Sequence, residues 1–84
     1  MITIRGELTA EKLLEEVGYW YGDFWIKDGK YYINNGEQTF CYDTPEEGLI
    51  DWLDTMLESN EDEDIETWSK REIAFVEALK EGKR

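Results

Sequence analysis

The side chains in this sequence best suited to chemistry are carboxylates that recur at helical spacing. Glu47, Asp51, Asp54 and Glu58 stand at positions i, i+4, i+7 and i+11. An α-helix with a rise of about 1.5 Å per residue would place them in one outward line roughly 16 Å long. B-form DNA presents one phosphate per about 3.4 Å along each strand. Together with neighbouring acids, this stripe approaches the density of a phosphate track, so its expected chemistry is pairing with the cations of a protein that holds DNA.

The stripe belongs to a longer stretch, residues 31–69, that carries acids and no base. This stretch holds twelve Asp and Glu residues, whereas the other nine acids are balanced by all nine Lys and Arg residues, so it accounts for the net charge of −12. Its acids outside the stripe are Glu37, Asp43, Glu46, Glu61, Asp62, Glu63, Asp64 and Glu66. Such a field disfavours direct contact with nucleic acid or anionic membranes and favours a basic protein partner. Two interpretations remain open, mimicry of nucleic acid and a generic acidic surface.

Catalytic and metal chemistry find little support in the same residues. The chain has no His, which is the commonest general base near neutral pH. Its single cysteine, Cys41, has no basic neighbour in sequence and is expected to be a small packing residue. Residues 60–64 resemble the start of a calcium loop, but Ile65 and Arg71 occupy the positions that need Gly and a bidentate Glu. We therefore expect a protein that is not an enzyme and uses no cofactor or metal.

Aromatic residues form a second candidate feature, in residues 19–25 and in the strand that follows. Trp and Tyr are enriched as anchors of protein interfaces when they are exposed. Trp25 and Tyr32 are predicted to lie on the sheet face away from the core, and we count them with the acids as partner-binding residues. Exposed aromatics are compatible with either a monomer or a homodimer.

The first element that must position these side chains is a short helix over residues 10–17. Thr9 is predicted to cap it, because a Thr hydroxyl can accept from an early helical N–H. Gly18 is predicted to end it, because Gly takes the left-handed conformation at low cost.

A three-stranded antiparallel meander is predicted over residues 19–43. Asp28–Gly29 and Asn35–Gly36 are strong hairpin signals. If each is a two-residue loop, Ile26 pairs with Tyr31 and Ile33 pairs with Gln38. The core face then carries Phe24, Ile26, Tyr31, Ile33, Phe40 and Tyr42, and the other face carries Trp25, Tyr32, Thr39 and Cys41.

Two further helices complete the predicted fold. Thr44 as cap, Pro45 as first helical residue and Glu47 three residues after the cap indicate the start of the helix that carries the stripe. The last helix is predicted over residues 65–80. The order α-β-β-β-α-α predicts an α+β fold, one small domain over residues 1–84 with helices packed on one face of the sheet. The lone cysteine is typical of a reducing cytosol, and no apolar run approaches the roughly 20 residues that span a bilayer.

The acid-rich loop after the second helix, the Asn-Gly hairpin and the element order resemble a known class. Small acidic proteins of phages and mobile elements inhibit host enzymes by imitating DNA, and the chain is similar in architecture and composition to the anti-CRISPR proteins that inhibit type II RNA-guided Cas nucleases. The resemblance implies that Glu37, Asp43 and the acids of residues 46–66 occupy the site that reads the protospacer-adjacent motif. It also implies a cytoplasmic location in a bacterial host cell. Restriction-enzyme inhibitors follow the same logic.

Two hypotheses about function come from these observations. The first is a DNA mimic that binds the basic groove of a nuclease or other DNA-binding enzyme. The second is an acidic protein-interaction module of a bacterial genome or mobile element, without mimicry.

Overall fold

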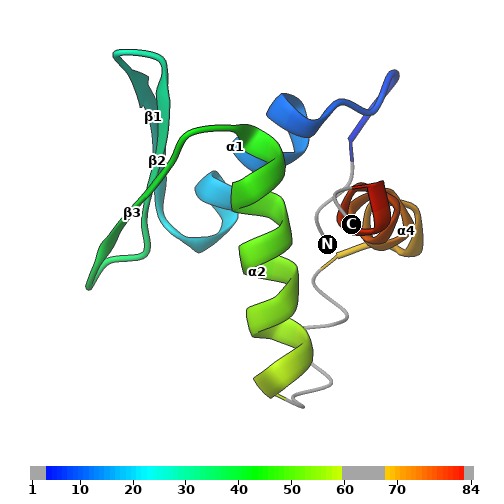
Figure 1. Cartoon of the computed structure of the whole chain (residues 1–84). Coiled ribbons are helices and arrows are strands. Elements are labelled where there is room, and N and C mark those ends of the chain that lie inside the picture. Colours follow the sequence, from blue (N-terminus) through cyan, green and yellow to red (C-terminus); the bar gives the residue numbers. More distant parts are fainter. Residues whose placement is uncertain (1–3, 60–67, 83–84) are drawn as a thin grey trace.

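The structure is a computed structural model that describes residues 4–59 and 68–82 of the chain. Its elements in order are α1 (Ala10–Tyr21), β1 (Asp23–Lys27), β2 (Lys30–Asn34), β3 (Thr39–Tyr42), α2 (Pro45–Ser59) and α4 (Lys70–Gly82). The predicted α+β fold with order α-β-β-β-α-α is confirmed. Figure 1 shows the sheet on one side of α1 and α2 and helix α4 on the other side.

Helix α1 begins where predicted and ends later than predicted. The Thr9 hydroxyl oxygen accepts from the Lys12 N–H at 3.3 Å, which confirms the cap. The helix continues through Gly18 to Tyr21, and the Gly22 N–H donates to the Gly18 carbonyl at 2.8 Å. The prediction that Gly18 ends the helix was therefore wrong. A Cβ at Gly18 would lie 2.6 Å from the Phe24 Cβ, so this glycine allows β1 to approach the helix.

The first hairpin has the predicted two-residue loop. Asp28 and Gly29 both adopt positive φ, of 52° and 76°, as the tight hairpin turn requires. The predicted pairs of β1 with β2 are confirmed, with Ile26 opposite Tyr31.

The second hairpin has a longer loop than predicted. Asn34 pairs with Thr39, and Ile33 pairs with Phe40 instead of Gln38. Side chains hold the loop closed, because Asn35 Oδ1 accepts from the backbone N–H groups of Glu37 and Gln38 at 3.0 and 2.9 Å. Since the register moves by two residues, each side chain keeps its predicted face.

The two faces of the sheet have different surroundings. Helix α1 packs on β1 and β2, and α2 packs on β3, so Ile33 on the inner face is fully buried. On the outer face the rings of Trp25 and Tyr32 stack at 5.5 Å. Cys41 lies in the same row and is exposed, so its prediction as a packing residue was wrong.

Helix α2 starts with the predicted cap. The Thr44 hydroxyl oxygen accepts from the Glu47 N–H at 3.3 Å, and Pro45 is the first helical residue. Leu49 and Leu53 are buried against α1 and α4. These two leucines therefore belong to the buried side of the helix.

Helix α4 begins at Lys70, later than the predicted residue 65. Trp68 precedes the helix and is 2% exposed in the core, and the Ser69 carbonyl accepts the first helical N–H, from Ile73. The prediction for residues 65–67 lies outside the described residues. Ser69 and Glu72 match the Ser-x-x-Glu sequence signature of a helix start, but among the described residues the Ser69 hydroxyl has no hydrogen-bond partner.

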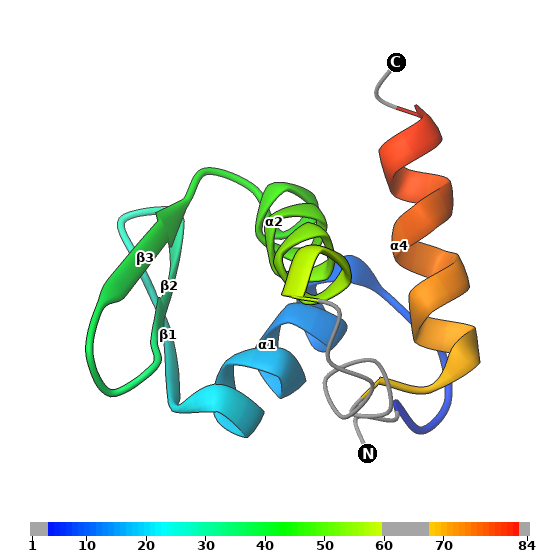
Figure 2. The ribbon, with the colours of Figure 1, turned by 90° about the horizontal axis from the view of Figure 1, so that it is seen from below.

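Helix α4 also holds the N-terminal segment of the described chain. The Arg71 guanidinium donates to the carbonyls of Ile4 and Gly6 at 3.2 and 2.9 Å. The fully buried Glu72 accepts from the Ile4 N–H at 3.3 Å. Figure 2 shows this segment running beside the first turn of α4. These hydrogen bonds from α4 side chains to backbone groups hold the N-terminal segment against α4, at the end of the molecule opposite the sheet.

Candidate protein-binding surface

The carboxylate stripe lies on α2. Figures 1 and 2 show that this helix runs between the sheet and α4. Glu47 and Asp51 are exposed. Asp54 is only partly exposed, because the Lys80 ammonium of α4 donates to its Oδ1. The expected outward line of carboxylates therefore includes one residue, Asp54, whose charge is paired with a base from another helix. The contact follows from the packing of α4 on α2, which brings the basic end of one helix to the acidic side of the other.

Asp51 is oriented by the sheet. The Tyr42 hydroxyl donates to Asp51 Oδ2 at 2.7 Å. Gly48 makes this contact possible, because a Cβ there would lie 3.0 Å from the Tyr42 ring. One turn later, the Thr55 hydroxyl donates to the Asp51 carbonyl at 2.9 Å. Asp51 is thus an exposed carboxylate in a fixed position.

Burial and the hydrogen bond to Asp51 raise the pKa of Tyr42 above its ordinary value of 10.0, with the Trp52 indole acting in the opposite direction. The folded protein therefore holds this proton at pH values where an unfolded tyrosine releases it. The stabilising contribution is complete below pH 10 and is lost as the pH rises toward the folded pKa.

We expect Tyr42→Phe to cost about 1 kcal/mol at pH 7, because one hydrogen bond is lost. Urea unfolding from pH 7 to 11 should show a smaller alkaline loss of stability for Tyr42→Phe than for the wild type. Tyr19→Phe, at an exposed position, is the matched control for the loss of a phenol hydroxyl. Equal slopes for wild type and Tyr42→Phe would contradict this assignment.

Glu37 lies in the loop of the second hairpin, outside α2. It is exposed in the four-residue loop that also contains Asn35. Asn35 and Asp51 line one small hollow, so this loop lies beside α2. We call the exposed carboxylates Glu37, Glu47 and Asp51 the acidic face.

Other predicted acids lie elsewhere or are paired within the domain. Asp43 is exposed and forms an ion pair with Lys30 at 3.4 Å on the outer side of the sheet. Glu46 is partly buried in the first turn of α2. Glu58 belongs to the end of α2, where the structure describes the backbone only. The remaining predicted acids, Glu61, Asp62, Glu63, Asp64 and Glu66, lie outside the described residues.

The predicted aromatic anchors are brought together with each other and not with the acidic face. Trp25 is 38% exposed and Tyr32 is partly exposed, on the sheet side that neither α1 nor α2 covers. Lys27 and Lys30 pair two rungs further along the ladder, which is the next pair on the same face of the sheet. The aromatic rings therefore stand beside basic residues.

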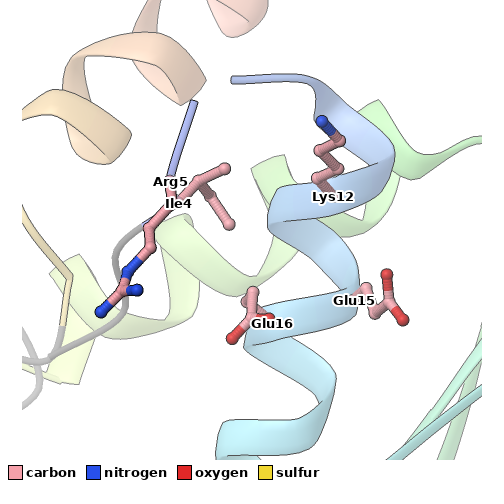
Figure 3. Close-up of a pocket in the computed structure, with 5 residues that line it drawn as sticks. All are labelled: Ile4, Arg5, Lys12, Glu15 and Glu16. Atoms are coloured by element: carbon pink, nitrogen blue, oxygen red, sulfur yellow. The ribbon is translucent and has the colours of Figure 1, made fainter. Parts of the chain in front are cut away.

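A hollow of about 360 Å³ lies between the N-terminal segment and α1. Ile4, Arg5, Lys12, Glu15 and Glu16 line it, and in Figure 3 the Glu15 carboxylate points away from Arg5. Because two bases and two acids line this hollow, their formal charges cancel, and the hollow does not extend the acidic surface.

Within residues 4–59 and 68–82, no group of three or more His, Cys, Asp or Glu residues is placed to hold a metal ion. Among the described helices, none is long and apolar enough to cross a membrane.

Two residues that shape the surface, Tyr42 and Lys80, are not among the predicted site residues. Tyr42 was assigned to the core face, which is correct, but its hydroxyl also reaches the stripe. Lys80 belongs to the last helix, and its ammonium reaches Asp54 of the stripe. Both contacts join separate elements, so local sequence does not predict them. The only signal for Lys80 is that the stripe has no base near it in sequence, which leaves a base from another element as its partner.

Comparisons with protein-family models, with curated proteins and with solved structures found no match to this chain. The structure itself describes an α+β domain with exposed carboxylates on α2 and on the second hairpin loop.

Proposed function

We propose that this domain is a non-enzymatic inhibitor that binds the basic nucleic-acid groove of a DNA-processing or defence nuclease in the bacterial cytoplasm. Within this proposal, the favoured target is a type II Cas nuclease, whose recognition of target DNA would be blocked. The choice of target rests on the resemblance in architecture and composition described above.

The observation that carries the proposal is the acidic face. Glu37, Glu47 and Asp51 are exposed on adjoining elements, and no Lys or Arg occurs in residues 31–69. A surface field of one sign attracts a partner of opposite sign and speeds association. Carboxylates form strong charge-assisted hydrogen bonds with the Arg and Lys side chains that otherwise hold phosphates.

The pairing of Asp43 with Lys30 and of Asp54 with Lys80 narrows the proposed contact surface. Exposed salt bridges are weak, in the range of about 0–1 kcal/mol. A partner's guanidinium could therefore replace either lysine, but each such contact gives up an ion pair with a base of this chain. We assign the first contacts to the acidic face, whose carboxylates are exposed.

A second candidate function is favoured by exposed aromatic residues at the end of α1. Tyr19 and Trp20 are 56% and 53% exposed. Such side chains serve as anchors for a partner that need not be basic. In this case the domain is a protein-interaction module, and its charge serves solubility.

Competition with DNA separates the two functions. Immobilised domain is incubated with lysate of a bacterial or phage-host strain, with and without excess duplex DNA, and the retained proteins are identified by mass spectrometry. The DNA-mimic proposal predicts a DNA-binding enzyme that excess DNA displaces and that high salt weakens. Retention of one partner at equal amounts with and without DNA would favour the interaction module.

A further inference from the structure

A small hollow on the sheet side of the acidic face combines aromatic walls with a carboxylate. It has a volume of about 110 Å³ and is lined by Asn35, Phe40, Asp51, Trp52 and Thr55. These residues come from the second hairpin and from the middle of α2, so the hollow lies where the two elements meet.

The walls of this hollow are fixed by contacts that do not involve a partner. The Trp52 ring stacks on Tyr21 with centroids 4.7 Å apart, and the Phe40 ring meets Trp52 edge-on at 5.5 Å. Asn35 is held by the backbone N–H groups that its side-chain oxygen accepts. A site built in this way loses little conformational entropy when it is occupied.

Two lining residues of the hollow, Asp51 and Thr55, carry oxygen atoms that can accept hydrogen bonds, whereas the Trp52 indole N–H is a donor that is buried without a partner in the described part of the chain. Asp51 receives the Tyr42 hydroxyl at Oδ2, and within the described residues its Oδ1 has no hydrogen bond. Thr55 uses its hydroxyl proton on the Asp51 carbonyl, so the lone pairs of its oxygen remain for a donor. A planar group with several N–H donors carries the hydrogens that two such acceptors require.

We propose that this hollow, the Asp51 socket, binds the guanidinium of an arginine side chain from a basic protein partner. Guanidinium is planar and weakly hydrated, stacks on aromatic rings and pairs with carboxylates. An ammonium is a compact, strongly hydrated charge and gains less from the aromatic walls. The identity of the partner as a nuclease rests on the proposed function, whereas the socket's preference for arginine follows from its own residues.

The test uses small probes, so it does not depend on finding the partner. The ¹⁵N-labelled domain is titrated with N-acetyl-arginine amide, with the matching lysine amide and with the matching citrulline amide, which has the same shape as arginine but no charge. We expect saturable shifts centred on the Trp52 indole N–H and on the backbone of Asn35 and Thr55. The dissociation constant for arginine should be on the order of a few millimolar, which is typical of a ligand of this size.

Two single substitutions that each remove one negative charge are compared, one in the socket and one outside it. Asp51→Asn keeps an oxygen for the Tyr42 hydroxyl and should weaken arginine binding at least 10-fold. Glu77→Gln removes one exposed carboxylate from α4 and should leave binding within 2-fold. Lysine should bind at least 3-fold more weakly than arginine, and citrulline more weakly still.

The socket is refuted if citrulline binds as well as arginine, or if Asp51→Asn and Glu77→Gln have the same effect. Shifts spread evenly over all exposed acids would also count against it. If arginine binds the socket but no partner is displaced by DNA, the socket stands and the proposed function fails. If DNA displaces a partner but arginine does not bind, the proposed function stands and the socket fails.

Discussion

Removal of the three charges of the acidic face is expected to weaken binding of a basic partner by about 100-fold at physiological salt. The triple variant is Glu37→Gln, Glu47→Gln and Asp51→Asn. Charge-assisted hydrogen bonds contribute about 1.5–3 kcal/mol each when formed, and partial exposure reduces that value. The loss of three contacts at about 1 kcal/mol each weakens the affinity by roughly 100-fold, because about 1.4 kcal/mol corresponds to a factor of ten in the dissociation constant. The substitutions keep side-chain oxygens for the start of α2 and for Tyr42.

The matched control removes three charges at other exposed positions, by Glu15→Gln, Glu77→Gln and Glu81→Gln on α1 and α4. It should change affinity by less than about 3-fold, because charges beyond a Debye length of about 8 Å are largely screened. Affinity for the captured partner is measured by calorimetry at two salt concentrations, after circular dichroism has shown that both variants are folded. Equal losses for both triple variants would mean that total charge, and not the acidic face, determines binding.

Replacement of the buried tryptophan is expected to have the largest effect on stability. Trp68 is 2% exposed and belongs to the core cluster with Leu13, Leu53 and Val76. Truncating a buried Trp to Ala costs about 3–5 kcal/mol, a large part of the roughly 5–15 kcal/mol that stabilises a small domain. Urea unfolding should therefore show that Trp68→Ala is unfolded or close to its midpoint at 37 °C.

Trp20→Ala is the control for this substitution, because the Trp20 side chain is 53% exposed on α1. Its cost should be below about 1 kcal/mol, since truncation at an exposed site removes little buried area. Similar losses at both positions would contradict the placement of Trp68 in the core.

The local signals in the sequence predicted most of the fold. Thr9, Thr44 and Asp28–Gly29 act through contacts with residues two or three positions away, so their roles could be predicted without knowledge of the fold. Gly18 misled the prediction because a glycine can serve close packing as well as a helix end. Its lack of a Cβ accommodates Phe24, and the chain turns at Gly22 instead.

The candidate surface was less accessible to sequence reasoning. Helical spacing correctly placed Glu47 and Asp51 on the exposed side of α2. It could not show that Lys80 approaches Asp54, because that contact depends on how two helices pack. Nor could it place the hairpin loop beside α2, since the loop length depends on hydrogen bonds that the Asn35 side chain makes in three dimensions.

The central claim is that the acidic face competes with DNA for a basic groove, and DNA binding by a purified nuclease tests it most directly. A guide-loaded type II Cas nuclease is mixed with fluorescent target DNA, and anisotropy is followed while the domain is added. We predict that bound DNA is released as the domain saturates, that excess DNA reverses the effect, and that salt near 0.5 M weakens it. Unchanged affinity for target DNA at saturating domain would contradict the assignment of a Cas nuclease as the target. If the partner captured from lysate also retained its DNA under the same conditions, DNA mimicry itself would be excluded.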